Sequence, residues 1–423
     1  MHKPNHPALA LHIPEPKQRP GDAPDFSEVV IPYAGKLARP DTAAPASALR
    51  DYPYTLIRVL DDRARAVGPW DPKLRPETYI GLLRHMLLTR TFDDRMFRAQ
   101  RQGKTSFYVK SLGEEAVACA AALALDRDDM CFPSYRQQGI LIARGWPLVE
   151  MVNQIYSNQG DLLKGRQLPV MYSAREAGFF SISGNLATQM PQAVGWAMAS
   201  AAKGDTKIAA AWCGEGSTAE GDFHSACTFA TVYHVPVIIN IVNNQWAISS
   251  YSGFAGGDET TFAARALGYG IAGLRVDGND PLAVYAATAW AAERARTNHG
   301  ATIIEHFTYR AEGHSTSDDP NAYRAAKTAA QWPLGDPIER LKAHLIGLGV
   351  WDEAQHEALA AELVQHVKTA QKEAEANGIL GHGLLQPLAS MFDDVFETQP
   401  WHLREQANAL EAENALRAAK EAR

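Results

Sequence analysis

The chain has 423 residues, of which 46% are hydrophobic and 21% are charged, and its formal net charge is −7. This composition is typical of a globular protein with a sizeable core, and the acidic balance argues against nucleic acid as a partner. No apolar run reaches the roughly 18 residues that a membrane span needs, and the proline-broken start lacks the apolar region of a signal peptide. Because the four cysteines form no C-x-x-C pair, we expect free, buried thiols and a cytoplasmic protein.

The chain begins with a proline-rich segment and then alternates between two patterns. Residues 1 to about 53 show little periodicity, which predicts an extended arm. Helical patterning starts near Pro76 and continues in GEEAVACAAALALD at 113–126. Further along, short apolar runs predict buried parallel strands separated by helices, which indicates an α/β fold with a doubly wound, mainly parallel sheet flanked by helices. The expected strands are 207–213, 235–242, 273–278 and 301–309, and the expected helices are 217–234 and 281–296.

The C-terminal part of the chain is helical in pattern. In WDEAQHEALAAELVQHVKTAQKEAEANG, one face carries Leu359, Leu363, Val364 and Val367, and the Asn-Gly pair at 377–378 ends the helix. We expect this tail to pack on the core or on partner subunits. The sequence therefore divides into an arm over 1–70, an α/β domain over 71–330 and a helical region over 331–423.

One glycine-rich turn predicts a metal site. GEGSTAEGD places the carboxylate of Glu215 between two glycines at the end of an expected strand, and an Asn-Asn pair at 243–244 ends the next strand. Ser217 and Glu220 fit a capping box, which predicts that the helix begins just after Gly216. Alone, a glycine-flanked acid is commonly only a turn. Because neighbouring parallel strands bring their carboxyl ends together, the combination predicts Mg²⁺ lying between Glu215 and phosphates at the helix start. GEGSTAEG does not match G-x-G-x-x-G, which disfavours a dinucleotide site.

Several motifs together carry a family resemblance. GEGSTAEGD followed by IVNNQWAIS looks like the thiamine-diphosphate signature, and SYRQQG, KGRQLP, SISGNLATQMPQAVG and YRAEGHSTSDDP occur in the expected order over roughly residues 75–400. The chain resembles the α subunits of branched-chain 2-oxoacid dehydrogenases, which are decarboxylating E1 components. The resemblance implies a thiamine-diphosphate-binding fold. It also implies decarboxylation of a small-molecule substrate such as 3-methyl-2-oxobutanoate and transfer of the acyl group to the lipoyl group of an E2 acyltransferase.

The resemblance also implies roles for individual residues. Glu215, Asn244 and the backbone carbonyl of Trp246 match Mg²⁺ ligands, and Tyr135 and Arg136 match a phosphate-binding pair. The active-site histidine corresponds to His314, a proton donor or hydrogen-bond partner of the bound intermediate. The remaining cofactor contacts are expected at Ser183, Gly184, Leu186, Gly214, Gly216 and Ser217. Relatives with this loop can bind K⁺ through positions that match Ser183, Asn185, Thr188 and Gln189.

The chain departs from the family pattern at a few of these positions. Gln245 and Trp246 stand where relatives usually have Gly-Tyr, Val242 replaces an arginine that touches the diphosphate in some relatives, and Asn185 replaces a proline. Ser315 aligns with a serine that is phosphorylated in mitochondrial relatives, and we expect it to have a structural role here. A second position that is phosphorylated in those relatives corresponds to Ala325 here. The residues expected to order this loop are Arg310, Asp318, Tyr323 and Arg324.

The sequence contains no convincing glutamate for the aminopyrimidine ring of the coenzyme, and in two-chain relatives the β subunit supplies it. We therefore expect half an active site, completed by an E1 β subunit in an α₂β₂ heterotetramer. Two alternatives stay open: a pyruvate or acetoin dehydrogenase α subunit, and a non-catalytic nucleotide-binding or scaffold protein. KGRQLP and HSTSDD favour the branched-chain reaction, and the set of Glu215, Asn244 and His314 disfavours a scaffold.

Overall fold

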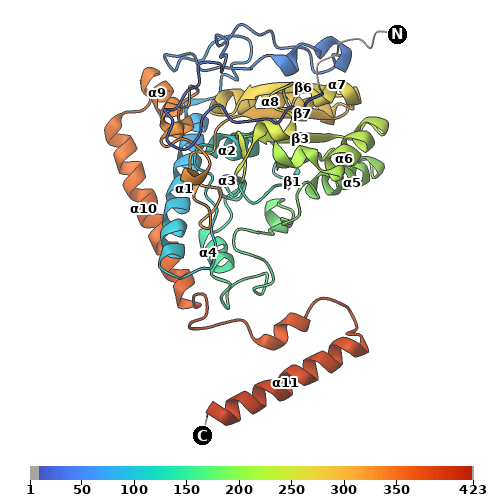
Figure 1. Ribbon diagram of the computed structural model, residues 1–423, viewed down its shortest axis with the longest axis vertical. Helices are drawn as coiled ribbons and strands as arrows, with labels where there is room; N and C mark the ends of the chain where they lie inside the picture. Colours follow the sequence, from blue (N-terminus) through green and yellow to red (C-terminus); the bar gives the residue numbers. More distant parts are fainter. Residues whose placement is uncertain (1–8, 422–423) are drawn as a thin grey trace.

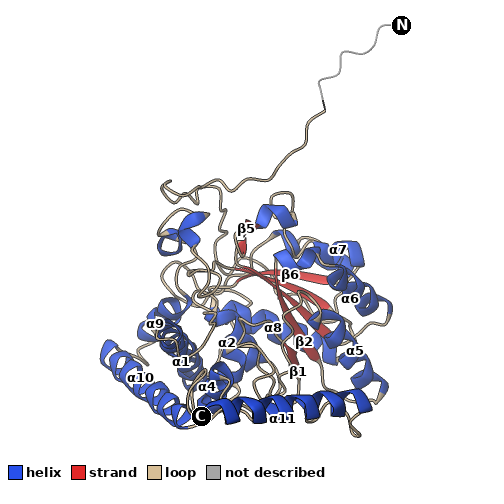
Figure 2. Ribbon diagram, turned by 60° about the horizontal axis from the view of Figure 1, so that its bottom comes forward, coloured by secondary structure: helices blue, strands red, loops and turns tan. Residues whose placement is uncertain are grey.

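A five-stranded parallel sheet, with strand order β1-β2-β3-β7-β6, forms the centre of the computed structural model, which describes residues 9–421 (Figures 1 and 2). Its middle strand, β3, is buried at every position, because helices cover both faces of the sheet. A separate antiparallel ribbon pairs β4 with β5. The strands are β1 (Met130–Phe132), β2 (Ala209–Gly214), β3 (Val237–Asn243), β4 (Trp246–Ala247), β5 (Ser250–Tyr251), β6 (Ala272–Asp277) and β7 (Thr302–Phe307).

Helices form a layer on each side of the sheet. One face shares a core with α1, α2, α3 and α8, and the opposite face packs against α5, α6 and α7. The helices are α1 (Pro76–Arg101), α2 (Glu115–Ala124), α3 (Gly139–Ala143), α4 (Leu148–Tyr156), α5 (Gln189–Ala202), α6 (Gly221–Val232), α7 (Arg265–Tyr269), α8 (Pro281–Arg296), α9 (Pro337–Gly347), α10 (Glu353–Ala376) and α11 (Trp401–Glu421). The predicted doubly wound α/β architecture is confirmed.

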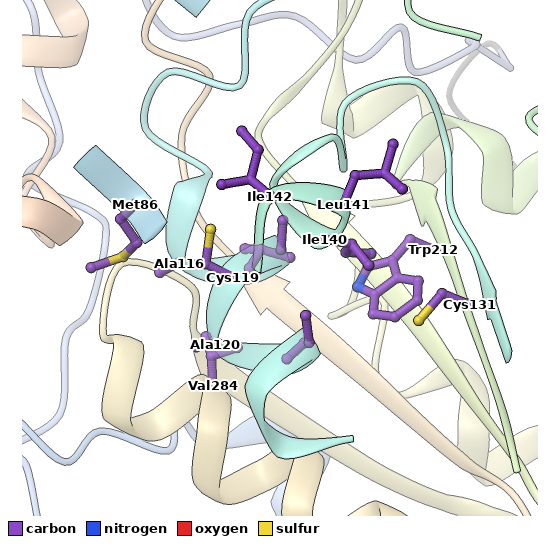
Figure 3. Close-up of a cluster of buried hydrophobic side chains, with 14 of the residues drawn as sticks. Met86, Ala116, Cys119, Ala120, Cys131, Ile140, Leu141, Ile142, Trp212 and Val284 are labelled. Carbon is purple, nitrogen blue, oxygen red and sulfur yellow. The ribbon is translucent and has the colours of Figure 1, made fainter. Parts of the chain in front are cut away.

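The larger core lies around the alanine-rich helix α2. Figure 3 shows Cys119 and Ala120 of α2 among side chains from α1, α3, α8 and β2, including Met86 and Trp212. Small side chains let α2 approach its neighbours closely in this core. All four cysteines are free and buried, as expected.

Most predicted elements agree with the structure. The four expected strands begin and end within two residues of β2, β3, β6 and β7, and the helices near Pro76, 113–126 and 281–296 are α1, α2 and α8. The strand β1 was not predicted. Helix α10 ends at Ala376 as expected, but Val364 is 42% exposed, so it does not share the buried face of Leu359, Leu363 and Val367. None of the helices within residues 9–421 combines the length and apolar character needed to cross a membrane.

The N-terminal arm is held against the edge of the domain. The indole Nε1 of Trp290 in α8 donates to the carbonyl of Pro40 at 2.9 Å, and Arg294 donates to the carbonyl of Thr42 at 2.6 Å. Farther along, Ile57 forms a parallel bridge with Val276 at the edge of β6. The segment that follows the arm therefore extends the sheet at its β6 edge.

The C-terminal region consists of two differently placed parts. Helix α10 packs along α1 and α4, whereas α11 lies apart from the sheet and its flanking helices at the end of an extended segment (Figure 1). The loop at 157–170 anchors that segment, since Arg166 donates to the carbonyl of Asp393 and Gln386 donates to the carbonyl of Asp161 at 3.1 Å. The KGRQLP motif thus holds the C-terminal segment against the domain.

Candidate active site

A cavity of about 560 Å³ opens at the carboxyl end of the sheet, where β2 and β3 lie side by side. The turn after β2 carries Glu215, whose backbone N–H donates to the carbonyl of Val242 in β3 at 3.2 Å, and the chain after β3 carries Asn244. Adjacent strands thus deliver both side chains to one cavity. Eleven predicted site residues line it: Tyr135, Arg136, Gly184, Leu186, Gly214, Glu215, Gly216, Ser217, Asn244, Trp246 and His314.

Glu215 is a buried carboxylate with an unused oxygen. The residue is 1% exposed, and its Oε1 has no hydrogen-bond partner within the described residues 9–421. Burial, with a smaller contribution from the Glu114 charge, raises the pKa of Glu215 to about 7, while Arg310 acts in the opposite direction. A buried carboxylate oxygen without a donor is a site that a cation would stabilise. The donor chemistry therefore fits a hard divalent cation.

The expected capping box after Glu215 is wrong. Residues Gly216–Ala219 form a short 3-10 helix, and α6 begins only at Gly221, with Glu220 rather than Ser217 in the N-cap position and no side-chain cap. The hydroxyl of Thr218 instead donates to the carbonyl of Glu215 at 2.5 Å. A Cβ at Gly216 would lie 2.5 Å from the Cβ of Ala247, so this turn is shaped by its close contact with β4. Ser217 still lines the cavity, but the helix start lies farther along the chain.

Asn244 contacts a second buried glutamate that the sequence analysis did not single out. Its Nδ2 donates to Oε1 of Glu114 at 2.7 Å, and Nε of Arg136 lies 3.6 Å from the same oxygen. Glu114 is 2% exposed and lines the cavity. Burial raises its pKa, and Arg136 is the largest opposing influence. The cavity thus contains two buried carboxylates beside a buried guanidinium.

Arg136 connects this group to His314. Its Nη2 lies 3.3 Å from Nδ1 of His314 and donates to the carbonyl of the same residue at 3.1 Å, while the ring of Tyr135 meets the imidazole edge-on at 5.6 Å. Because a guanidinium can only donate, Nδ1 must accept and the proton resides on Nε2. Burial and the charges of Arg136 and Arg310 lower the pKa of His314 to about 3. His314 is therefore a neutral hydrogen-bond donor through Nε2.

The loop that carries His314 is ordered by the residues expected to do so. Arg310 donates to the carbonyl of Trp246 at 3.1 Å and to the hydroxyl of Tyr323 at 2.6 Å, and that hydroxyl donates to Asp318 at 2.6 Å. Arg324 in turn donates to the carbonyl of Arg310 at 2.7 Å. The Trp246 carbonyl accepts this hydrogen bond with one of its two lone pairs, so it can also face a cation.

Two more segments border the cavity. Leu186 is 50% exposed at its rim, next to Ala187 with a φ of 62°. The other residues of this loop make local bonds: the Ser183 hydroxyl accepts from the N–H of Asn185 at 3.1 Å, and Thr188 donates to the Asn185 carbonyl at 3.1 Å. The amide of Gln189 donates to the Trp212 carbonyl at 2.6 Å. On another side of the cavity, Val242 contributes an apolar wall where some relatives have arginine.

A larger cavity of about 710 Å³ lies between the N-terminal arm and an aromatic cluster. Phe26 of the arm packs edge-on against Tyr309 and Trp332 there, with ring centroids 5.8 and 5.3 Å apart. This cavity shares Trp246 and Tyr251 with the smaller one, but Glu215, Arg136 and His314 line only the smaller one. The chemistry is therefore placed in the smaller cavity.

Comparison with known proteins gives consistent matches. The model of the dehydrogenase E1 component family matches residues 83–382, and that of the N-terminal region of the 2-oxoisovalerate dehydrogenase E1 α subunit matches residues 7–47. The chain is 60% identical to the α subunit of 2-oxoisovalerate dehydrogenase from Pseudomonas aeruginosa over 95% of its own length and 98% of that protein. It is 40% identical to the human mitochondrial α subunit over 84% of this chain and 79% of that one, and 37% identical to α subunit 1 of Arabidopsis thaliana over 86% and 75%. The chain therefore belongs to the dehydrogenase E1 component family, among the α subunits of 2-oxoisovalerate dehydrogenase.

Proposed function

We propose that this α subunit binds thiamine diphosphate through Mg²⁺ and completes its active site with a β subunit, to decarboxylate branched-chain 2-oxoacids such as 3-methyl-2-oxobutanoate. The observation that carries the proposal is the buried Oε1 of Glu215, which finds no hydrogen-bond partner in the described part of the chain and shares a cavity with Asn244 and Trp246. Membership in the E1 family implies the coenzyme, and the donor set supports the metal. Within residues 9–421 no three His, Cys, Asp or Glu residues cluster as a metal site, so the proposed ligands are one carboxylate, one amide oxygen and one backbone carbonyl.

The cavity residues would hold different parts of the coenzyme. Glu215, Asn244 and the Trp246 carbonyl would hold Mg²⁺, and the positive charge of Arg136, with Tyr135, would stabilise the diphosphate. Gly184 and Leu186, at the rim, would contact the middle of the coenzyme. Other contacts are proposed for Ser183, Gly214, Gly216 and Ser217, and a K⁺ site for Ser183, Asn185, Thr188 and Gln189, whose loop is held by the short bonds described above.

His314 is proposed to act on the substrate as a neutral donor. Bound thiamine diphosphate supplies an electron sink for decarboxylation of the 2-oxoacid. Since Arg136 donates to Nδ1 of His314, its Nε2–H is free to donate to an oxygen of the bound substrate. The low pKa of His314 keeps the ring uncharged at neutral pH, so it orients and polarises rather than titrates.

The architecture of the cavity supports the half-site proposal. The carboxylates that line it are Glu114 and Glu215, and both lie on the side of Arg136 and Asn244. We propose that neither serves the aminopyrimidine ring and that the β subunit supplies a third carboxylate. At the rim, Ile248 is 55% exposed and Phe254 is 60% exposed, which leaves an apolar edge for a partner to cover. We further propose an α₂β₂ assembly in the cytoplasm that transfers the acyl group to the lipoyl group of E2.

One reconstitution tests the proposal and its alternative. The chain should release no CO₂ from 3-methyl-2-oxobutanoate alone, and should do so with its β partner, Mg²⁺ and thiamine diphosphate. Pyruvate is assayed in parallel for CO₂ release and acetoin for acetaldehyde release, because α subunits for those substrates are the alternative. Full activity of the lone chain contradicts the half-site. A preference for pyruvate or acetoin contradicts the branched-chain assignment.

A further inference from the structure

Glu114 is a buried residue of the cavity, and none of the roles proposed so far belongs to it. It lies at the start of α2 and contacts two proposed cofactor-binding residues at once: Asn244 at 2.7 Å and Arg136 at 3.6 Å. The side chain is cut off from water, since the residue is only 2% exposed. A buried glutamate costs stability unless it is paired and hydrogen-bonded, and here Arg136 and Asn244 are the partners.

The chemistry of the Glu114 contact determines how the Asn244 amide is oriented. An asparagine presents an oxygen on one branch and an NH₂ group on the other, and the two branches have nearly the same shape. An ionised carboxylate only accepts, so Asn244 must turn its NH₂ group towards Glu114. Its Oδ1 then lies on the opposite branch, where it accepts the N–H of Trp246 at 3.3 Å. Without Glu114, the 3.3 Å bond from the Trp246 N–H would be the remaining hydrogen bond that favours this orientation, and the opposite orientation presents hydrogens to a cation.

We propose that Glu114 is a positioning residue that fixes the Asn244 amide with its oxygen available to the metal. This inference rests on the proposed function, because it takes Asn244 as a Mg²⁺ ligand. Groups that orient a metal ligand from behind commonly change metal affinity about 10- to 100-fold when they are removed.

The backbone around Glu114 is built to aim this side chain into the cavity. Gly113 has a φ of 92°, and a Cβ there would lie 2.6 Å from the Tyr309 carbonyl, so only glycine fits. The Gly113 carbonyl accepts from Asn279 and from Thr308, each at 3.1 Å. The neighbouring carboxylate of Glu115 faces away from the cavity, accepting from Arg90 at 2.7 Å. Two adjacent buried glutamates thus have separate partners, and Glu115 offers a matched control.

Glu114 could also act simply by balancing the charge of Arg136, and one substitution separates the two roles. Glu114→Gln keeps an oxygen that can accept from Asn244 but removes the negative charge. Glu114→Leu removes both the acceptor and the charge at nearly the same size. Orientation of the amide predicts that the glutamine variant resembles the wild type, whereas charge balance predicts that it resembles the leucine variant.

The test measures Mn²⁺ binding by electron paramagnetic resonance to the full chain assembled with its β subunit and saturated with thiamine diphosphate. Glu114→Leu should raise the Mn²⁺ dissociation constant about 10- to 100-fold, and Glu114→Gln by no more than about threefold. Glu115→Gln should lower the thermal unfolding temperature and leave Mn²⁺ affinity unchanged. Affinity in Glu114→Leu within about twofold of wild type, or an equal loss in Glu114→Leu and Glu114→Gln, overturns the inference.

If Glu114→Leu fails to assemble, Glu114→Met decides the question. Methionine has a flexible side chain of similar length that offers no strong hydrogen-bond acceptor to Asn244. Glu114→Met should raise the Mn²⁺ dissociation constant about 10- to 100-fold, and an affinity within about twofold of wild type overturns the inference. Absence of any thiamine-diphosphate-dependent Mn²⁺ binding to the wild type would instead refute the proposed function itself, so the two failures are distinguishable.

Discussion

Replacing Glu215 by glutamine should stabilise the metal-free chain while abolishing its response to the cofactor. Burial moves the pKa of this carboxyl from its ordinary 4.5 to about 7. Because the folded state raises the pKa of Glu215, the carboxyl is protonated at low pH in both the folded and the unfolded chain, and burial then carries no penalty for a charge. The fold therefore loses stability as the pH rises from 4.5 through 7, and the loss is complete above that range. Such a change in pKa corresponds to about 3 kcal/mol.

Glutamine has nearly the same shape and never ionises, so the variant isolates this effect. In EDTA at about pH 8, Glu215→Gln should unfold with a free energy about 3 kcal/mol higher than wild type, and at about pH 5 the difference should fall below about 1 kcal/mol. Urea unfolding followed by tryptophan fluorescence measures both values. Mg²⁺ with thiamine diphosphate and the β subunit should then raise the unfolding temperature of the wild type and leave the variant unchanged. Equal stability of the two proteins at both pH values would refute the burial argument, and an unchanged cofactor response in the variant would refute the metal assignment.

Two further predictions concern the backbone and the loops of the cavity. Gln245 has a φ of 75°, which is a left-handed backbone conformation. Gln245→Gly and Gln245→Ala lose the same side-chain bonds, but only alanine keeps the strain of that conformation, so the glycine variant should be more stable by about 1 kcal/mol in urea unfolding. A more stable alanine variant contradicts this. Arg265 donates to the carbonyl of Thr218 at 3.0 Å and to that of Ala255 at 2.6 Å, so it connects two loops that border the cavity. Arg265→Met should loosen both loops and weaken thiamine-diphosphate binding about tenfold. Fluorescence titration with the β subunit present measures this affinity. Unchanged affinity would show that the two loops are held without this clamp.

The strands were predictable because each is buried on both faces and therefore reads as a continuous apolar run. In β3, the segment Val237–Asn243 contains no exposed position, and its run of mainly apolar, β-branched residues alone indicates a central strand. The strand β1 escaped prediction because three residues, Met130–Phe132, are too few to establish a period. The predicted helix start at Ser217 was wrong for a different reason. A local capping pattern competes there with the contact between Gly216 and Ala247, which are 31 positions apart in the sequence and become neighbours only in the fold.

The candidate site shows the same division between local and distant information. Glu215 and Asn244 could be found because both follow a strand, and parallel strands end at the same edge. Glu114 could not, because an acidic residue in the first turn of a helix is common and favourable in any protein. What turns Glu114 inward is the anchoring of Gly113 by Asn279 and Thr308, which are distant in sequence. A pair of adjacent glutamates after a glycine is the only local signal that could have pointed to it.

The charges around the cavity explain why metal and coenzyme should bind together. When Glu114 and Glu215 are both ionised, their two negative charges match the two positive charges of the Arg136 and Arg310 guanidinium groups, so the site is then formally neutral without ligands. A dication alone would leave an excess of positive charge in a buried region, and a diphosphate alone would leave an excess of negative charge, and each excess is costly at low dielectric. Mg²⁺ and diphosphate together nearly cancel. The affinity of each should therefore rise in the presence of the other, by the same factor in both directions. We expect this coupling to act through Glu215, because its Oε1 has no hydrogen-bond partner among the residues that the structure describes.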